Sequence, residues 1–165
     1  MFVWGITSPI LFSQYSYICT AMERTIKVFK ASDTAYLLAL LLRYRILRIP
    51  LGLTYSVSDL EKDIQDIHIG LFEGGRILAT LILTDTGNQS MKMRQVAVDT
   101  AYQSQGLGKE LVAYAEQYAR SQGYVLMHCH ARDTARKFYL QGGYHIVGEP
   151  FTEVGIEHSY MQKAL

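Results

Sequence analysis

The stretch Val96–Gln122, VAVDTAYQSQGLGKELVAYAEQYARSQ, predicts a strand, a glycine-containing turn and a helix in direct succession. Its first three residues are apolar, and two glycines, Gly106 and Gly108, lie in the polar segment that follows. From Leu107 onward, apolar residues recur at the spacing of one helix face. The first turn of a helix has backbone N–H groups without partners and carries the positive end of the helix dipole. Such a turn is typical of a phosphate-binding site.

Three known glycine patterns can be compared with this turn. A phosphate loop of the nucleotide-triphosphatase type requires Ser or Thr after Gly-Lys, but Glu110 follows Lys109. A dinucleotide-binding turn requires a third glycine, which is missing here. The pattern that fits is Gln-x-x-Gly-x-Gly, formed by Gln103, Gly106 and Gly108. A two-glycine connection without any ligand is the alternative.

Length and composition indicate one globular domain and exclude several classes. The chain has 165 residues, and 49% of them are hydrophobic, so it can bury a substantial core. Its net charge is +1 without blocks of like charge, which argues against a nucleic-acid groove. Cys19 and Cys129 have no metal-binding or redox spacing. We therefore expect a reduced, cytoplasmic setting.

The first 21 residues differ from the rest because they contain no charged side chain. They lack the basic region of a signal peptide, and their apolar run is too short and too polar for a membrane span. We therefore expect no membrane partner. Our hypothesis is that 1–21 is an N-terminal extension and that 22–165 is the single domain.

Patterning along the domain predicts alternating strands and helices. The helix after the glycine turn must cross between two parallel strands, whereas the preceding strands form antiparallel neighbours. For the second helix, Ser58 and Glu61 suggest a capping box. The expected strands are 24–29, 67–72, 77–83, 91–98, 124–129, 144–147 and 159–163, and the expected helices are 33–48, 56–62, 107–122 and 133–141.

A second motif follows one helix and one strand after the glycine turn. The segment Ala135–Tyr144, ARKFYLQGGY, resembles the A-x-x-F-Y-x-x-x-G-[FY] segment of the GNAT superfamily of N-acetyltransferases, and the glycine turn resembles the pyrophosphate loop of the same superfamily. The resemblance covers about 26–165, and the tail 148–161 is similar to a bacterial subgroup of predicted acetyltransferases. It implies a mixed α/β fold with a central sheet of about six to seven strands, mostly antiparallel, one central parallel splayed pair and about four helices.

The resemblance also implies a coenzyme site. The pantetheine arm would pair with free backbone groups of the strand before the loop, where one N–H polarises the thioester carbonyl. The pyrophosphate would lie on N–H groups of the loop. Arg132 stands where many family members have asparagine, so it could contact the coenzyme, contact a carboxylate of the acceptor, or be a surface charge. The implied coenzyme-binding residues are Val96, Ala97, Val98, Gln103, Ser104, Gln105, Gly106, Leu107, Gly108, Lys109, Arg132 and Tyr139.

Tyr139 matches the family tyrosine that protonates the leaving thiolate of coenzyme A. The alternative is that it only packs on the sheet, and we expect Phe138 to fill that structural role. An amine acceptor is protonated at neutral pH, so a group must also take up its proton. The strand 91–98 contains no acidic residue for this purpose. The candidates are His128, His130, Glu153 and His158.

Each candidate base has a structural alternative. His130 is closer to the end of its strand than His128, but a strand histidine is often a satisfied core group. Glu153 and His158 could simply fix the turn on which they lie. His128 and His130 share one strand face, yet no third metal ligand is spaced nearby, so we expect no metal site.

The interpretation is an enzyme that transfers an acetyl group from acetyl-coenzyme A to a primary amine by direct attack in a ternary complex. The partners would be acetyl-coenzyme A, a small-molecule amine and, as the family suggests, a second copy of the chain in a homodimer. One alternative is a non-catalytic acyl-coenzyme A sensor or scaffold. Another is an enzyme that acetylates protein lysines or N-termini.

Overall fold

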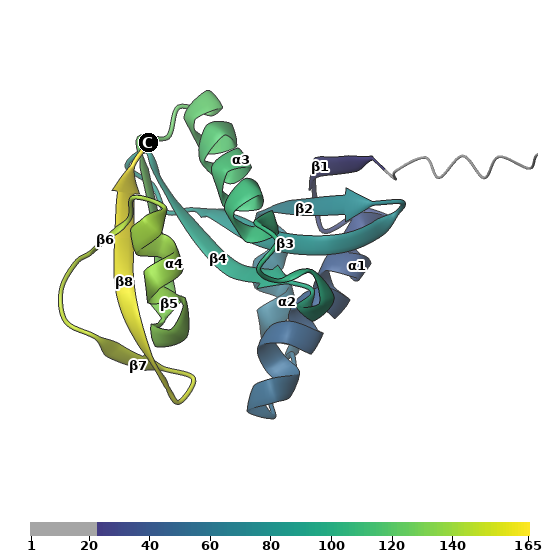
Figure 1. The fold of residues 1–165 in the computed structure, drawn as a ribbon, viewed down its shortest axis with the longest axis horizontal. Coiled ribbons are helices and arrows are strands. Elements are labelled where there is room, and N and C mark those ends of the chain that lie inside the picture. The colour runs from purple at the N-terminus through teal and green to yellow at the C-terminus, as the bar shows by residue number, and fades with distance from the viewer. Residues whose placement is uncertain (1–22) are drawn as a thin grey trace, which may run out of the picture.

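The computed structural model describes residues 23–165, so the proposed extension 1–21 lies outside the described residues. The elements follow one another in a mixed α/β order, drawn in Figure 1. The strands are β1 (Arg24–Phe29), β2 (Ile67–Glu73), β3 (Arg76–Asp85), β4 (Ser90–Val98), β5 (Leu126–Arg132), β6 (His145–Ile146), β7 (Phe151–Glu153) and β8 (Ile156–Ala164). The α-helices are α1 (Thr34–Arg43), α2 (Val57–Asp63), α3 (Leu107–Ser121) and α4 (Arg136–Gln141).

The eight strands of residues 23–165 form one sheet in the order β1-β2-β3-β4-β5-β8-β6, with β7 paired to β8. The pair β4–β5 is parallel and the other pairs are antiparallel. The predicted mixed sheet with one central parallel pair is therefore confirmed. The sequence pattern missed β7, which has three residues and pairs with the neighbouring strand through a tight turn at Val154 and Gly155.

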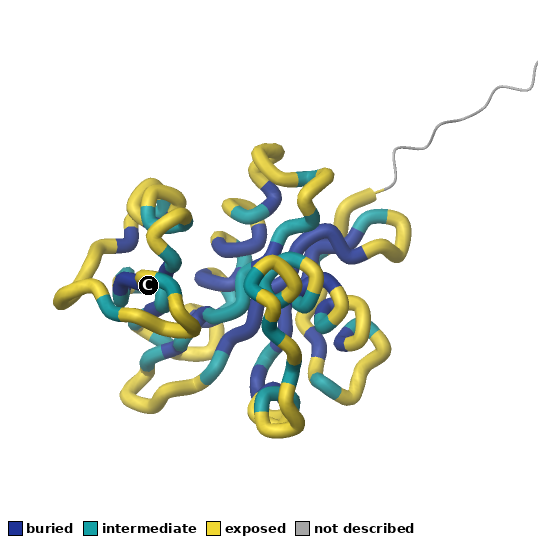
Figure 2. Tube along the Cα trace, turned by 90° about the horizontal axis from the view of Figure 1, so that it is seen from below, coloured by how far each residue is buried: buried dark blue, intermediate teal, exposed yellow. Residues whose placement is uncertain are grey.

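Helices cover the two faces of the sheet unequally. Helix α3 packs on one face of β2–β4, and α1 packs on the other face of β3 and β4 (Figure 1). Helix α4 contacts β5 on the same face as α3, since both helices share one core cluster with Met127, Cys129 and Ala131. Buried residues follow the central strands in Figure 2, and exposed residues occupy the turns at the periphery. No α-helix covers β5 and β8 on the α1 side within 23–165.

The parallel strands separate soon after they meet. They pair at three positions, which end at Lys92 opposite His128, and then diverge, as Figure 1 shows. On its other side β4 has a bulge, where Gln95 and Val96 oppose Leu81 of β3. Gln95 has φ 51°, in the left-handed region. A bulge bends a strand and increases its twist, which directs β4 away from β5.

Two helix predictions need correction. The α-helix expected over 33–48 ends at Arg43, continues as a π-helical turn over Tyr44–Arg48, and stops in a 3₁₀ turn that contains Pro50. The cap of α2 is Ser56 rather than Ser58, and its capping-box partner is Asp59 rather than Glu61. Ser56 has the extended backbone that a cap requires, and its side chain accepts a hydrogen bond from the Asp59 N–H at 3.2 Å.

A buried ionic network connects α1, α2 and β4. Arg43 and Asp63 are fully buried and joined at 2.9 Å. Arg94 of β4 donates to Asp63 at 3.0 Å and also pairs with Asp66. Two cations and two carboxylates balance their charge here, so none is left buried without a counter-ion. The network fixes the α1–α2 layer against the strand that ends at the glycine loop.

Candidate active site

The glycine loop has the geometry that an anion site requires. Gly106 precedes α3 with φ 85°, a left-handed conformation that suits glycine, and Ser104 also has positive φ. The first N–H groups of α3, from Leu107 to Lys109, have no partner within the helix. The Gln103 side chain donates to the Val98 carbonyl at 3.1 Å and so ties the loop to the end of β4. A 15-residue helix thus points the positive end of its dipole at the space beside β4.

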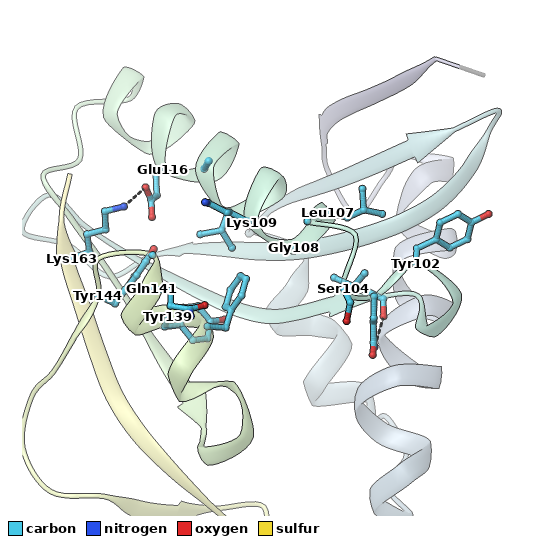
Figure 3. A pocket seen from close by; sticks show the side chains of 17 residues that line it. Tyr102, Ser104, Leu107, Gly108, Lys109, Glu116, Tyr139, Gln141, Tyr144 and Lys163 are labelled. Carbon is cyan, nitrogen blue, oxygen red and sulfur yellow. Dashed lines mark hydrogen bonds and ion pairs between the residues drawn. The ribbon is translucent and has the colours of Figure 1, made fainter. Parts of the chain in front are cut away.

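A groove of about 520 Å³ begins at this loop. It passes between α3 and α4 and ends at Lys163, whose ammonium pairs with Glu116 at 2.6 Å (Figure 3). The Cβ of a residue at position 108 would be 3.5 Å from Val98 and 3.6 Å from Phe138. The groove residues are Val98, Tyr102, Gln103, Ser104, Gly106, Leu107, Gly108, Lys109, Val112, Ala113, Glu116, Phe138, Tyr139, Gln141, Gly142, Tyr144 and Lys163.

Most of the predicted coenzyme residues lie at this groove, and four do not line it. Val96 and Ala97 lie on the adjoining part of β4, after the separation from β5, where the strand edge toward β5 lacks a strand partner among residues 23–165. Gln105 donates from its side chain to the Ala101 carbonyl at 3.3 Å. Arg132 lies elsewhere, on the face that α3 and α4 leave uncovered. The strand edge and the loop together form a site for a chain-like ligand with an anionic group.

Tyr139 is the buried aromatic residue of α4, with 7% of its surface exposed. Its ring meets those of Phe138 and Tyr144 edge-on, at 5.0 and 5.4 Å. We expected Phe138 to be the packing residue, but Phe138 is 37% exposed and lies at the groove. Burial raises the pKa of Tyr139 well above its ordinary value, with a smaller contribution from Cys129. The hydroxyl therefore stays protonated at neutral pH and is available as a hydrogen-bond donor.

The predicted bases gather on the other face of the sheet. His130, His128 and Arg132 alternate along β5 with the core residues, so they point away from α3 and α4. The Nδ1 of His130 is 2.7 Å from the Oε2 of Glu153 on β7. His158 is buried, stacks on Phe151, and its Nδ1 contacts the Ile156 carbonyl at 3.0 Å.

The charge state of Glu153 follows from these neighbours. Partial burial would raise the pKa of this carboxyl group, but the hydrogen bond with His130 and the charges of His130, His158 and Lys92 outweigh it. The pKa of Glu153 is thus lowered, and the group is a carboxylate at neutral pH. A carboxylate in this position orients the His130 ring through the hydrogen bond at Nδ1.

Arg132 borders a second, smaller cavity of about 290 Å³. Its guanidinium donates to the Leu47 carbonyl at 3.2 Å and so joins the end of β5 to the π-helical turn. Burial lowers the pKa of Arg132, but a guanidinium remains charged at neutral pH. The other lining residues of this cavity are Leu51, Asp133, Thr134, Ile156 and Glu157.

Sequence reasoning missed several residues at the two sites. Lys92 reaches His130 with its ammonium group, at 3.3 Å from Nε2. Tyr55 donates to the side chain of Gln95 at 3.1 Å, next to the bulge of β4. Period-2 alternation places Lys92 on the same face as His128, but the contact with His130 depends on the β4–β5 register, which the sequence pattern does not reveal. Gln95 carries no signal for a bulge because it is not glycine.

Two further observations concern metal ligands and membrane spans. Within 23–165, no group of three or more His, Cys, Asp or Glu residues is placed to hold a metal ion. His128 instead stacks on Tyr160 and contacts the Thr86 hydroxyl at 3.2 Å. No helix in the described part of the chain is long and apolar enough to cross a membrane.

Separated parallel strands, a glycine loop at a helix N-terminus and a buried tyrosine at the groove agree with the arrangement that the GNAT resemblance implied. Residues 55–165 match the family model described as "Acetyltransferase (GNAT) domain", so the chain belongs to this family. A protein named "Uncharacterized N-acetyltransferase YitI" from Bacillus subtilis is 26% identical over 75% of this chain and 88% of its own length.

Solved structures agree with the fold. A protein from Lactobacillus plantarum assigned as an N-acetyltransferase is 26% identical, with a TM-score of 0.79, over 86% of this chain and 98% of its own. An aminoglycoside 6'-N-acetyltransferase complexed with coenzyme A has a TM-score of 0.69 at 15% identity, over 85% of this chain and 96% of its own. At that identity the likeness supports the fold alone.

Proposed function

We propose that the chain transfers an acetyl group from acetyl-coenzyme A to the primary amine of a small molecule. The observation that carries this proposal is the position of Tyr139. It lies buried at the groove that begins at the phosphate-type loop, and next to it β4 has a strand edge free of β5. A proton donor and an anion site are thus combined with a backbone edge that can hold an extended arm.

On the coenzyme side, the loop residues Gln103–Lys109 bind the pyrophosphate through N–H groups and the dipole of α3. The free edge of Val96–Val98 binds the pantetheine arm, and one of its N–H groups polarises the thioester carbonyl. The amine nitrogen attacks that carbonyl carbon directly. As the C–S bond breaks, Tyr139 donates its phenolic proton to the departing thiolate.

On the acceptor side, the proton of the amine must leave before or during the attack. His130, oriented by Glu153 and with His158 close by, is the proton acceptor of this proposal. The proton reaches it directly or through an intervening group. The His130 ring is 29% exposed as a side chain, so it can release the proton to water.

The cavity at Arg132 supports a small acceptor. Its volume of about 290 Å³ suits a metabolite rather than a protein segment. The aromatic rings of Tyr44, Tyr55 and Phe151 lie on the same face of the sheet as this cavity. Because Arg132 does not line the coenzyme groove, we propose it as a contact for an acceptor carboxylate instead. An enzyme acting on protein amines is the competing proposal, and a panel of small amines beside basic peptides distinguishes the two.

Three accompanying proposals concern the whole protein: one catalytic domain over 22–165, a cytoplasmic location and a homodimer. Helix α1 supports self-association, since Leu37, Leu38 and Leu41 are 61%, 41% and 65% exposed on its outer face. Such neighbouring exposed leucines are typical of a contact surface.

The test is release of coenzyme A by wild type and by Tyr139→Phe across the amine panel. We expect amine-dependent release by wild type and a loss of about 100-fold or more in kcat for the variant, because general acid catalysis contributes at least that factor. Acetyl-coenzyme A binding should be similar in both proteins. Binding without release by wild type would instead favour the non-catalytic sensor.

A further inference from the structure

Lys92 lies at the point where the central strands separate. It is the last residue of β4 that pairs with β5, opposite His128. Its side chain points to the face of the sheet opposite α3 and α4, because its neighbours Met91 and Met93 lie in the core beneath α3. The Nζ of Lys92 is 3.3 Å from Nε2 of His130 and 3.4 Å from Nδ1.

The hydrogen bonds of His130 determine what Lys92 can do. A carboxylate only accepts hydrogen bonds, so the 2.7 Å contact with Glu153 places a proton on Nδ1 of His130. In the neutral ring, Nε2 then has a free lone pair, which can accept a proton from Lys92. Lys92, His130 and Glu153 thus lie in contact from the strand separation to the protein surface. The Nζ of Lys92 is almost equally far from both ring nitrogens, so a small turn of its side chain is needed to align it with the Nε2 lone pair.

The surroundings of Lys92 lower the pKa of its ammonium group below the ordinary lysine value. Partial burial lowers the pKa of the Lys92 ammonium group, and the negative charge of Glu153 raises it. The positive charge of Arg94 lowers this pKa further, and Cys129 raises it weakly. His128 and His130 also face Lys92 from β5, and the same burial and the charge of Lys92 lower the pKa of His128. A neutral amine at this place is a base, and a protonated one is a proton donor to His130.

We propose that Lys92 is the catalytic base that contacts the acceptor amine and passes its proton to His130. The inference rests on the proposed acetyl transfer. The acceptor ammonium loses one proton to the Nζ of neutral Lys92, and the freed lone pair of its nitrogen forms the bond to the thioester carbon. Lys92 then gives that proton to Nε2 of His130, which is oriented by Glu153 and passes the proton to water. As the C–S bond breaks, Tyr139 protonates the thiolate. The nitrogen releases its second proton to solvent, and the Tyr139 phenolate takes one proton back from solvent, so charge and protons balance.

A different role for Lys92 would use only its positive charge, to bind an acceptor carboxylate. Two substitutions of similar length distinguish these roles. Lys92→Arg keeps the charge but cannot act as a base near neutral pH, since a guanidinium does not lose its proton there. Lys92→Met keeps the volume but has neither charge nor basicity.

The experiment measures kcat/KM for the best amine from pH 6.5 to 10 in wild type and both variants. We expect both variants to lose about 100-fold or more at pH 7. The deficit should shrink toward pH 10, where the acceptor amine loses its own proton in solution. Activity retained by Lys92→Arg and lost by Lys92→Met would overturn the proposal in favour of charge recognition, and unchanged activity in both would overturn it altogether.

Acetyl-coenzyme A binding separates this inference from the proposal on which it depends. Both variants should bind as tightly as wild type, because Lys92 lies across the sheet from the groove. If wild type neither binds nor turns over acetyl-coenzyme A, the proposed function fails. If wild type is active and the variants keep its pH profile, the role of Lys92 alone fails.

A titration without acceptor provides a second readout. In protein labelled with ¹³C at the lysine ε-carbon, the Lys92 signal is identified by its loss in Lys92→Met. We expect its midpoint below that of the other lysines, and still lower in Glu153→Gln, which removes the stabilising negative charge. An ordinary lysine midpoint that does not respond to Glu153→Gln would contradict the proton chain.

Discussion

The substitution Gly108→Glu tests the anion site with little risk to the fold. Gly108 is the second residue of α3, and a Cβ there would make ordinary contacts of 3.5 and 3.6 Å to Val98 and Phe138. A carboxylate in the first helical turn also interacts favourably with the dipole. Gly106 is a poorer choice, because its φ of 85° would strain any other residue.

The expected loss of affinity follows from charge repulsion. A carboxylate about 4 Å from a phosphate charge costs about 1 kcal/mol in bulk water and about 4 kcal/mol at the effective dielectric constant near a protein surface. Since about 1.4 kcal/mol is tenfold in Kd, acetyl-coenzyme A should bind about 5- to 1000-fold more weakly. Isothermal titration calorimetry of wild type and Gly108→Glu measures this difference.

The matched control for this substitution is Gly108→Ala, which adds a Cβ without a charge. We expect it to raise helix stability by up to about 1 kcal/mol and to weaken binding far less than glutamate does. Thermal unfolding should show that both variants are at least as stable as wild type. A folded Gly108→Glu protein with wild-type affinity would refute the idea that this loop holds a phosphate.

Three further predictions concern stability and domain organisation. Asp63→Asn should lower the free energy of unfolding in urea by about 3–5 kcal/mol, because Arg43 stays buried without its counter-ion. The control Glu73→Gln, which breaks the exposed ion pair with Arg24, should lower it by under about 1 kcal/mol. Burial lowers the pKa of His128 in the folded state, so the free energy of unfolding should fall as the pH drops below about 6.5, by up to about 1.4 kcal/mol per pH unit. The fall should be less steep in His128→Asn, and equal slopes in the two proteins would contradict this. Deletion of 1–21 should leave a folded protein with wild-type coenzyme affinity, and insoluble or inactive protein would argue against a separate extension.

Local chemistry explains which features the sequence could predict. The glycine loop depends on a positive φ at Gly106 and on the start of α3, both of which are encoded within a few residues. The parallel β4–β5 pair follows because a single helix connects the two strands. The family motif drew attention to Tyr139, which lines the groove, although it did not indicate that Tyr139 rather than Phe138 is buried.

The missed features depend on distant residues or on very short elements. Ser56 and Ser58 have equivalent cap signals, and the choice of Ser56 becomes clear only from its extended backbone. Strand β7 is too short for a period-2 pattern. The contact between Lys92 and His130 joins residues 38 positions apart, and it depends on where β4 and β5 separate. Such geometry arises from tertiary packing, which local patterns do not contain.

The most direct test of the proposed activity is the release of coenzyme A from acetyl-coenzyme A, followed with a thiol reagent while primary amines are added. We expect release that depends on an amine, matches the amount of acetylated product by mass, and falls in Gly108→Glu at subsaturating acetyl-coenzyme A. Tight binding of acetyl-coenzyme A with no amine-dependent release from any small amine or peptide would contradict it, and the groove would then serve to bind the coenzyme without catalysis.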